Sequence, residues 1–206
     1  MNPQTVPVSV DIIDLGLAVA AEWHALPLSD GDATGWALDL ASQLAEGEAA
    51  ETLTAELGDV CTRLRQLNNP YLSAAVYLPR AEFGLLDCLL SYEVIERTAE
   101  ITPESFLRDA EHQRTLRTPE MLVRDVFTWT GTVQAGELIG SRTLNTYRAA
   151  EQGWVEERVV IGVFPQGARQ FVILTFTLYD LNAIADLPAF AQDVVETLEL
   201  ELGSAS

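Results

Sequence analysis

Alternation of apolar and polar residues is clearest in two neighbouring segments near the C-terminus. In residues 155–163 apolar side chains alternate with charged residues and glycine, and in residues 172–178 they alternate with threonine. A period of two is typical of β-strands. The turn at 164–168 joins the segments, so we expect an antiparallel hairpin. The charges at Glu156, Glu157 and Arg158 predict one solvated face on its first strand.

A period near 3.6 marks the helices. Apolar residues recur at this spacing in 36–44 and 53–67, and the second run stops at Asn68-Asn69-Pro70. Thr102 and Pro103 form a helix start, because a hydroxyl caps the helix and proline suits its first turn. We expect that helix to reach about Arg117. The last helix starts at Asp186 and is predicted to continue to 202, followed by a flexible tail at 203–206.

The remaining apolar segments predict further strands. An extended segment is expected at 8–28, strands at 72–78, 85–95, 121–130 and 138–148, and a loop containing glycine at 131–136. Short turns favour antiparallel pairing, and amphipathic helices need a sheet face to cover. The sequence therefore predicts one α+β domain over 1–206. It has an antiparallel sheet of six or seven strands with helices packed on its faces, including a helical pair within 29–70.

This order of elements resembles the sandwich fold shared by the photosystem PsbP proteins and the Ran-binding Mog proteins. The resemblance lies in the strand pair 72–78 and 85–95, the capped helix from Thr102, and the closing segments 155–162, 171–178 and 187–198. It implies an α/β/α sandwich, and roles in binding and assembly more often than in catalysis. No functional residue of the family can be matched to a position here.

The charge is strongly negative. The chain has 31 acidic and 12 basic residues, a net charge of −19, and every basic residue is arginine. Phosphate backbones and anionic membranes repel such a surface, so we expect neither nucleic acid nor a membrane as a partner. No signal peptide or membrane span is predicted. These features fit a soluble, cytoplasmic protein, and a protein partner would be basic.

Residues for catalysis are scarce. His24 and His112 are the only histidines, and no serine stands in a Gly-x-Ser-x-Gly frame. Cys61 and Cys88 lie in separate apolar segments and are predicted to be reduced and unbonded. The acidic pairs Asp30/Asp32, Glu156/Glu157 and Glu199/Glu201 are interpreted as solvated faces. We therefore predict no metal and no cofactor.

Six residues are the candidates for binding. Arg108, Arg114, Arg117 and Arg124 form the one basic cluster. Ion pairs with Glu104 and Glu111 would make it a solvated helix face, whereas an open cluster would bind an anion or an acidic peptide. Trp129 and Trp154 fall on strands, where large aromatic residues belong to the core or to a partner-binding patch.

Two functions remain open. The first is a non-catalytic protein-interaction or assembly module, which the absence of a catalytic constellation favours. The alternative is a small-molecule-binding protein or an unrecognised hydrolase with a pocket between sheet and helices. An enclosed apolar pocket with converging polar groups would favour the alternative. A flat or convex surface with exposed apolar side chains would favour the first.

Overall fold

Seven strands form one antiparallel sheet in the computed structural model, which describes residues 10–29, 31–115, 117–118, 121–148 and 153–204. Its strands are β2 (Trp23–Ala25), β3 (Ser73–Tyr77), β4 (Cys88–Glu96), β5 (Met121–Val133), β6 (Gly136–Arg148), β7 (Gly153–Phe164) and β8 (Gln170–Leu178). Their order across the sheet is β2-β3-β4-β8-β7-β6-β5. The strands β1 (Val10–Leu17) and β9 (Leu198–Ser204) pair separately as a two-stranded ribbon. The predicted α+β fold is confirmed.

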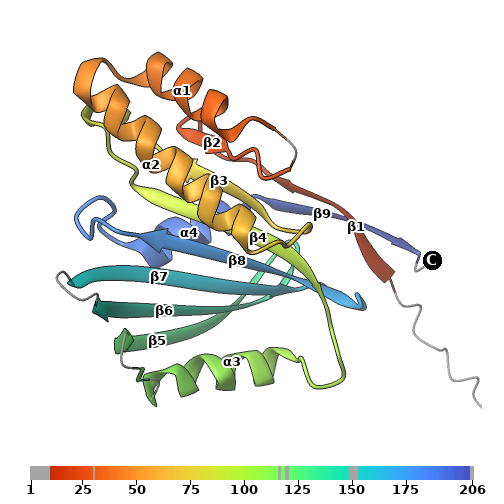
Figure 1. Cartoon of the computed structure of the whole chain (residues 1–206). Coiled ribbons are helices and arrows are strands. Elements are labelled where there is room, and N and C mark those ends of the chain that lie inside the picture. Colours follow the sequence, from red (N-terminus) through yellow and green to blue (C-terminus); the bar gives the residue numbers. More distant parts are fainter. Residues whose placement is uncertain (1–9, 30, 116, 119–120, 149–152, 205–206) are drawn as a thin grey trace, which may run out of the picture.

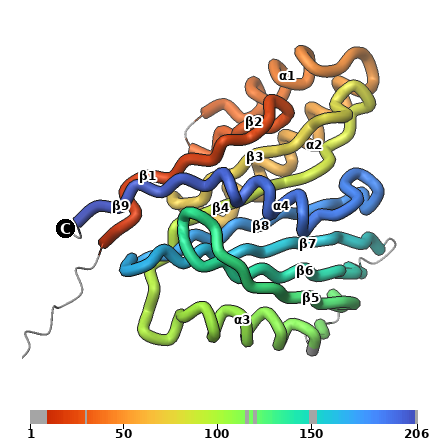
Figure 2. Tube along the Cα trace, turned by 180° about the vertical axis from the view of Figure 1, so that it is seen from behind, coloured from red at the N-terminus to blue at the C-terminus, as the bar shows by residue number. Residues whose placement is uncertain are grey.

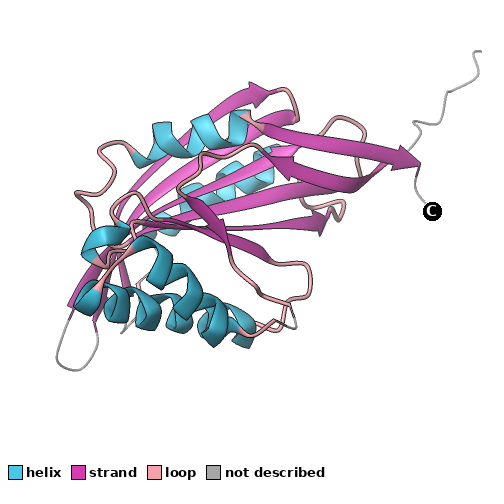
Figure 3. Cartoon of the chain, turned by 90° about the horizontal axis from the view of Figure 1, so that it is seen from above, coloured by secondary structure: helices cyan, strands magenta, loops and turns pink. Residues whose placement is uncertain are grey.

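Helices cover both faces of this sheet (Figures 1 and 3). The helices α1 (Ala33–Leu44), α2 (Gly47–Gln66) and α3 (Pro103–His112) lie on one face, where α1 and α2 cover β3 and β4 and α3 covers β6 and β7. Seen from behind, α4 (Leu187–Glu196) and the ribbon lie on the opposite face, over a core built from β4, β7 and β8 (Figure 2). The molecule is a sandwich of helix, sheet and helix layers.

The predicted hairpin of β7 and β8 is confirmed. Val159 pairs with Phe176, and Val163 pairs with Val172. The predicted solvated face of β7 is wrong, because Glu156 and Glu157 are only 4% and 8% exposed. β7 is an inner strand with layers on both faces, so these carboxylates are held inside by arginine partners rather than by water.

Side-chain caps confirm the two predicted helix starts at Thr102 and Asp186, and α1 has such a cap as well. The side chain of Asp32 accepts a hydrogen bond from the Gly35 N–H at 3.0 Å and caps α1. Thr102 and Ser105 form a capping box at the start of α3. Asp186 caps α4 by accepting from the Ala189 N–H at 3.0 Å.

The ends of two helices differ from the prediction. The helix from Thr102 ends at His112 and continues only as the short 3₁₀ turn η2 (Gln113–Thr115). The last helix ends at Glu196, and β9 follows it. In residues 198–202 leucine alternates with glutamate, a pattern that also suits a strand, and pairing with β1 selects the strand. β9 extends to Ser204, into the predicted tail, while residues 205–206 lie outside the described part.

Two smaller predictions concern the β5–β6 connection and the cysteines. β5 extends to Val133, so the connection is the two residues 134–135 rather than the loop expected at 131–136. Cys61 on α2 and Cys88 on β4 are buried and free, and they belong to different clusters of the core. In the described part, no helix is long and apolar enough to cross a membrane.

Candidate functional site

The first two arginines of the predicted basic cluster do not form the expected ion pairs. Neither Arg108 with Glu104 nor Arg114 with Glu111 is a salt bridge in the described part of the chain. Arg108 is exposed on α3. Arg114 lies beyond the end of α3, where helical spacing no longer applies, and its Nη2 donates to the Val126 carbonyl at 2.9 Å.

The other two arginines also serve local structure. Arg117 forms a single β-bridge with Leu122. Arg124 stands at the register shift of β5, and its Nε donates to the Thr146 hydroxyl at 3.2 Å. Arg114, Arg117 and Arg124 thus lie where the end of α3 meets the start of β5. None of them lines either cavity considered below, and their role in binding an anion stays a prediction.

The two candidate tryptophans lie on opposite faces of the sheet. Trp129 packs on the α4 face, directly over Gly140 of β6, where an added Cβ would overlap the indole ring. Trp154 lies on the α2 face and is 47% exposed. Its ring stacks on Tyr147, with centroids 5.0 Å apart and planes 13° apart. Trp129 is therefore a packing residue, and Trp154 is the one open to a partner.

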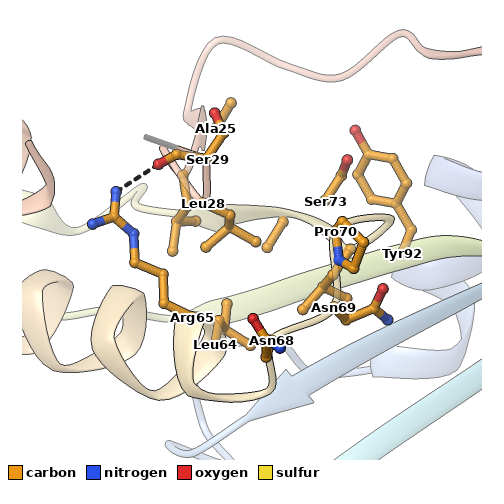
Figure 4. Close-up of a pocket in the computed structure, with 13 residues that line it drawn as sticks. Ala25, Leu28, Ser29, Leu64, Arg65, Asn68, Asn69, Pro70, Ser73 and Tyr92 are labelled. Carbon is orange, nitrogen blue, oxygen red and sulfur yellow. Dashed lines mark hydrogen bonds between the residues drawn. The ribbon is translucent and has the colours of Figure 1, made fainter. Parts of the chain in front are cut away.

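A large cavity lies at the edge of the sheet, between β2, β3 and the end of α2 (Figure 4). Its volume is about 700 Å³, and we call it the edge cavity. The residues that line it are Ala25, Leu26, Leu28, Ser29, Leu64, Arg65, Asn68, Asn69, Pro70, Leu72, Ser73, Ala74 and Tyr92. More than half of this lining is apolar, and the rest carries hydroxyl, amide and guanidinium groups.

The strongest polar groups of the edge cavity are already engaged. Nη2 of Arg65 donates to the carbonyls of Pro27, Ser29 and Gly31 at 2.5, 2.9 and 2.6 Å and so holds that loop against α2. Asn69 donates to Glu93 at 2.5 Å. Arg65 and Asn69 therefore stabilise the walls of this cavity.

A second cavity, which we call the end groove, lies between α2 and the sheet where β6 ends and β7 begins. Its volume is about 560 Å³. The residues that line it are Glu56, Asp59, Val60, Arg63, Leu86, Tyr147, Trp154, Glu156, Arg158 and Tyr179. It combines an exposed aromatic stack with five charged groups and two phenols. This is the richer of the two cavities in chemical groups.

Four of the five charged groups in the end groove form two ion pairs. Arg63 binds Asp59 at 3.1 Å, and Arg158 binds the buried Glu156 at 2.7 Å. The Tyr147 hydroxyl also donates to Glu156, at 3.3 Å. The buried carboxylate thus fixes both an arginine and one ring of the aromatic stack.

Glu56 is the charged group that remains. No arginine lies within ion-pair distance of its carboxylate in the described part of the chain. Burial raises the pKa of Glu56, and a hydrogen bond with the backbone of Leu86 opposes this rise. Burial likewise raises the pKa values of Tyr147 and Tyr179, so both phenols are neutral at pH 7.

One arginine joins the segments that border the end groove. Arg80 binds the buried Asp87 through Nε at 2.9 Å, and its Nη2 binds Asp180 at 3.1 Å. Asp87 follows the lining residue Leu86, and Asp180 follows Tyr179. The 3₁₀ turn η1 (Ala81–Phe83) and Gly84 pack against α2, since an added Cβ on Gly84 would lie 2.8 Å from the Ala49 carbonyl. The segments that border the end groove are therefore held to each other by Arg80 and to α2 by the packing of Gly84.

Exposed apolar side chains belong to these same bordering segments. Phe83, Leu85 and Leu181 are exposed, in addition to Trp154 and Tyr179 of the groove itself. The end groove offers aromatic surface, carboxylates and phenols, and the described residues of its lining include no histidine, cysteine or serine. Such a set suits binding by stacking and ion pairing.

Sequence reasoning found Trp154 but not its surroundings. Tyr147 and Trp154 flank the connection of two predicted strands at matching positions, so their cross-strand pairing could have been inferred from the hairpin. Glu56 carries no such signal, because its place in the groove depends on Leu86, which is distant in the sequence. In the described residues, no group of three or more His, Cys, Asp or Glu side chains could hold a metal ion.

Comparison with known proteins adds likenesses of fold only. No protein-family model and no curated protein matches the sequence. The structure is similar to LpqN of Mycobacterium tuberculosis, which is involved in cell envelope biogenesis, with a TM-score of 0.49 and 15% identity over 96% of this chain and 87% of that one. It is also similar to PA94 of Pseudomonas aeruginosa, a protein of unknown function, with a TM-score of 0.34 and 9% identity over 63% and 74%.

A third similar structure comes from Bacteroides thetaiotaomicron, with a TM-score of 0.40 and 11% identity over 95% of this chain and 49% of that one. At these levels none of the likenesses carries an argument about function. None of the three is named as a PsbP or Mog protein, so the resemblance drawn from the sequence stays a prediction.

Proposed function

We propose that the protein is a non-catalytic interaction module that binds a basic protein partner at the end groove. The observation that carries this proposal is the stack of the exposed Trp154 on Tyr147, in a groove whose lining also holds a carboxylate without an arginine partner in the described part of the chain. Tryptophan and tyrosine are the residues most enriched where protein partners bind tightly, because they bury a large surface at a small entropic cost.

The shape of the region supports a macromolecular partner. The end groove is open, since Trp154 and Tyr179 in its lining are exposed to solvent. Phe83, Leu85 and Leu181 are further exposed apolar residues on the bordering segments that Arg80 joins. A surface of exposed apolar residues with a polar border is typical of protein interfaces.

Charge supports a basic partner. The chain has a net charge of −19. On α2 and η1, the carboxylates of Glu48, Glu51, Glu56 and Glu82 have no salt bridge in the described part of the chain. Arg63, Arg80 and Arg158 are paired with carboxylates, and Arg65 of α2 donates to backbone carbonyls, so the acids are in excess. An uncompensated negative field accelerates association with a positive surface and repels acidic ones.

Affinity capture from the native cell tests the proposal when it compares matched variants. Trp154→Ala removes the open ring of the end groove. Phe127→Ala removes another exposed aromatic residue, on the opposite face of the sheet, and serves as the control. We expect a partner that the wild type and Phe127→Ala retain and Trp154→Ala loses. A set of captured proteins that is unchanged by Trp154→Ala would contradict the proposal.

A second candidate function rests on the edge cavity. Its volume of about 700 Å³ and its mostly apolar lining fall in the range of small-molecule sites. Ser73→Trp would fill this cavity. Native mass spectrometry of protein isolated from its own cells tests this function: a small molecule bound to the wild type and absent from Ser73→Trp would support it. Identical masses apart from the substitution would count against it.

A further inference from the structure

We propose that the end groove receives an arginine side chain of the partner, with its guanidinium group between the open face of Trp154 and the carboxylate of Glu56. This inference rests on the proposed function and names the group that the site recognises. Both residues line the same cavity, Trp154 from β7 and Glu56 from α2.

The first step is the charge left over in the groove. Arg63 is neutralised by Asp59, and Arg158 is neutralised by Glu156. The Nε of Arg158 is buried and out of reach of a ligand. Among the described residues of the lining, one negative charge remains, on Glu56, so a cation is the complementary ligand.

The second step is the state of the Glu56 carboxylate. A carboxylate can accept about four hydrogen bonds. Glu56 has a hydrogen bond with the backbone of Leu86 and no salt bridge in the described part of the chain. Glu56 is exposed on α2, but the walls of the groove remove part of the water around its carboxylate and so raise its pKa. A bound cation would restore the stabilisation that water no longer supplies.

The third step is the aromatic surface. One face of Trp154 is covered by Tyr147, whose hydroxyl is fixed by its hydrogen bond to Glu156. The stack therefore holds the indole ring in place and leaves its other surface open to solvent. A cation over the face of tryptophan is attracted by the ring quadrupole, and tryptophan is the strongest aromatic group for this contact.

Arginine fits this pair of groups better than lysine does. Its guanidinium is planar, so it can stack on an indole ring while its N–H groups face a carboxylate in two parallel hydrogen bonds. The ammonium of lysine is compact and strongly hydrated, and it lacks the planar fork that forms two parallel hydrogen bonds with a carboxylate. Both groups line the same groove, which favours the planar cation.

Nuclear magnetic resonance titration with a capped glycine-arginine-glycine peptide tests the inference. The readouts are the indole N–H of Trp154 and the backbone N–H of Leu86. We expect saturable shifts of both, and binding about fivefold weaker, about 1 kcal/mol, for the same peptide with neutral citrulline or with lysine. Equal binding of the arginine and citrulline peptides, or no saturable shift, would overturn the arginine site.

Four variants sharpen the test. Glu56→Gln and Trp154→Ala should each weaken the arginine peptide about fivefold. Trp154→Tyr, which keeps an aromatic face, should keep most of the affinity. Glu51→Gln removes another exposed acid of α2 and should leave the affinity unchanged. Unchanged affinity in Glu56→Gln would overturn the role of that carboxylate, once a melting curve shows that the variant is folded.

The two proposals can fail separately. If the arginine peptide does not bind but Trp154→Ala still loses the captured partner, the arginine site is wrong and the proposed function stands. If Trp154→Ala retains every captured partner as well, both are wrong.

Discussion

Trp129 lies flat over Gly140, the residue that faces it across the β5–β6 pair. The indole occupies the space that a side chain on β6 would take, and it packs against the core on the α4 face. This relationship explains why one of the two candidate tryptophans is structural. A large aromatic residue on an antiparallel strand often covers a cross-strand glycine.

The Trp129–Gly140 contact predicts a stability effect. Gly140→Ala would place a methyl group within the indole ring and force Trp129 to move, at a cost of about 1–3 kcal/mol in the free energy of unfolding. Gly131→Ala is the matched control on β5, because its Cβ would have an ordinary contact of 4.0 Å with Leu138. Urea denaturation measures both. Equal midpoints for the two variants would contradict the packing described.

Arg80 predicts a second effect, through the buried carboxylate of Asp87. Asp87 is 1% exposed, and one of its oxygens has no hydrogen-bond partner in the structure. Arg80→Met would leave this charge unpaired, at a cost of about 3 kcal/mol. Adding Asp87→Asn to that variant should recover most of the loss, because the charge is then gone. Urea midpoints of the two single variants and the double variant test this, and a double variant no more stable than Arg80→Met would show that the ion pair does not set the cost.

The raised pKa of Glu56 predicts a pH dependence. When the pKa of a carboxyl group is higher in the folded state than in the unfolded state, ionisation of that group destabilises the fold. The free energy of unfolding therefore falls as the pH rises from the unfolded-state pKa through the folded-state pKa. Glu56→Gln should therefore raise the melting temperature at neutral pH. Below the ordinary glutamate pKa of 4.5 both proteins carry a neutral side chain there, and the difference should vanish. A stabilisation that is the same at both pH values would argue against burial as the cause.

The two cysteines predict a reactivity pattern. Burial raises the pKa of Cys88 to about 12 and also raises the pKa of Cys61. Because the thiolate is the reactive form, neither thiol should react with an alkylating reagent in the native protein near neutral pH. Unfolding without reductant should expose two alkylatable thiols, which intact-mass measurement counts. A mass two hydrogens lighter with no alkylation would reveal a disulfide.

Local signals in the sequence predicted much of the fold. Thr102, Asp186 and the alternation around Val159 specify caps and a strand through contacts near in the chain, and the structure has all three. The segment at 198–202 could not be assigned in this way. Its leucines suit both a helix face and a strand face, and only the distant partner β1 selects the strand.

Two other differences between the sequence-based predictions and the structure involve charged residues. Glu156 and Glu157 resemble a solvated face when the sequence is considered alone, because burial of a carboxylate depends on a partner from elsewhere. Arg142 on β6 supplies that partner for Glu157 at 2.5 Å. The end groove could not be predicted from the sequence for the same reason, because its residues are distant from one another in the chain. It is assembled from α2, β6, β7, Leu86 before β4 and Tyr179 after β8, and only Trp154 in it was a candidate beforehand.

The dissociation constant of the captured partner tests the account most directly, measured by calorimetry for the wild type, Trp154→Ala and Phe127→Ala. If the end groove is the binding site, Trp154→Ala should weaken the complex by at least about tenfold, about 1.4 kcal/mol, and Phe127→Ala should match the wild type. Equal dissociation constants for Trp154→Ala and the wild type would contradict the claim that this groove is where the protein binds its partner.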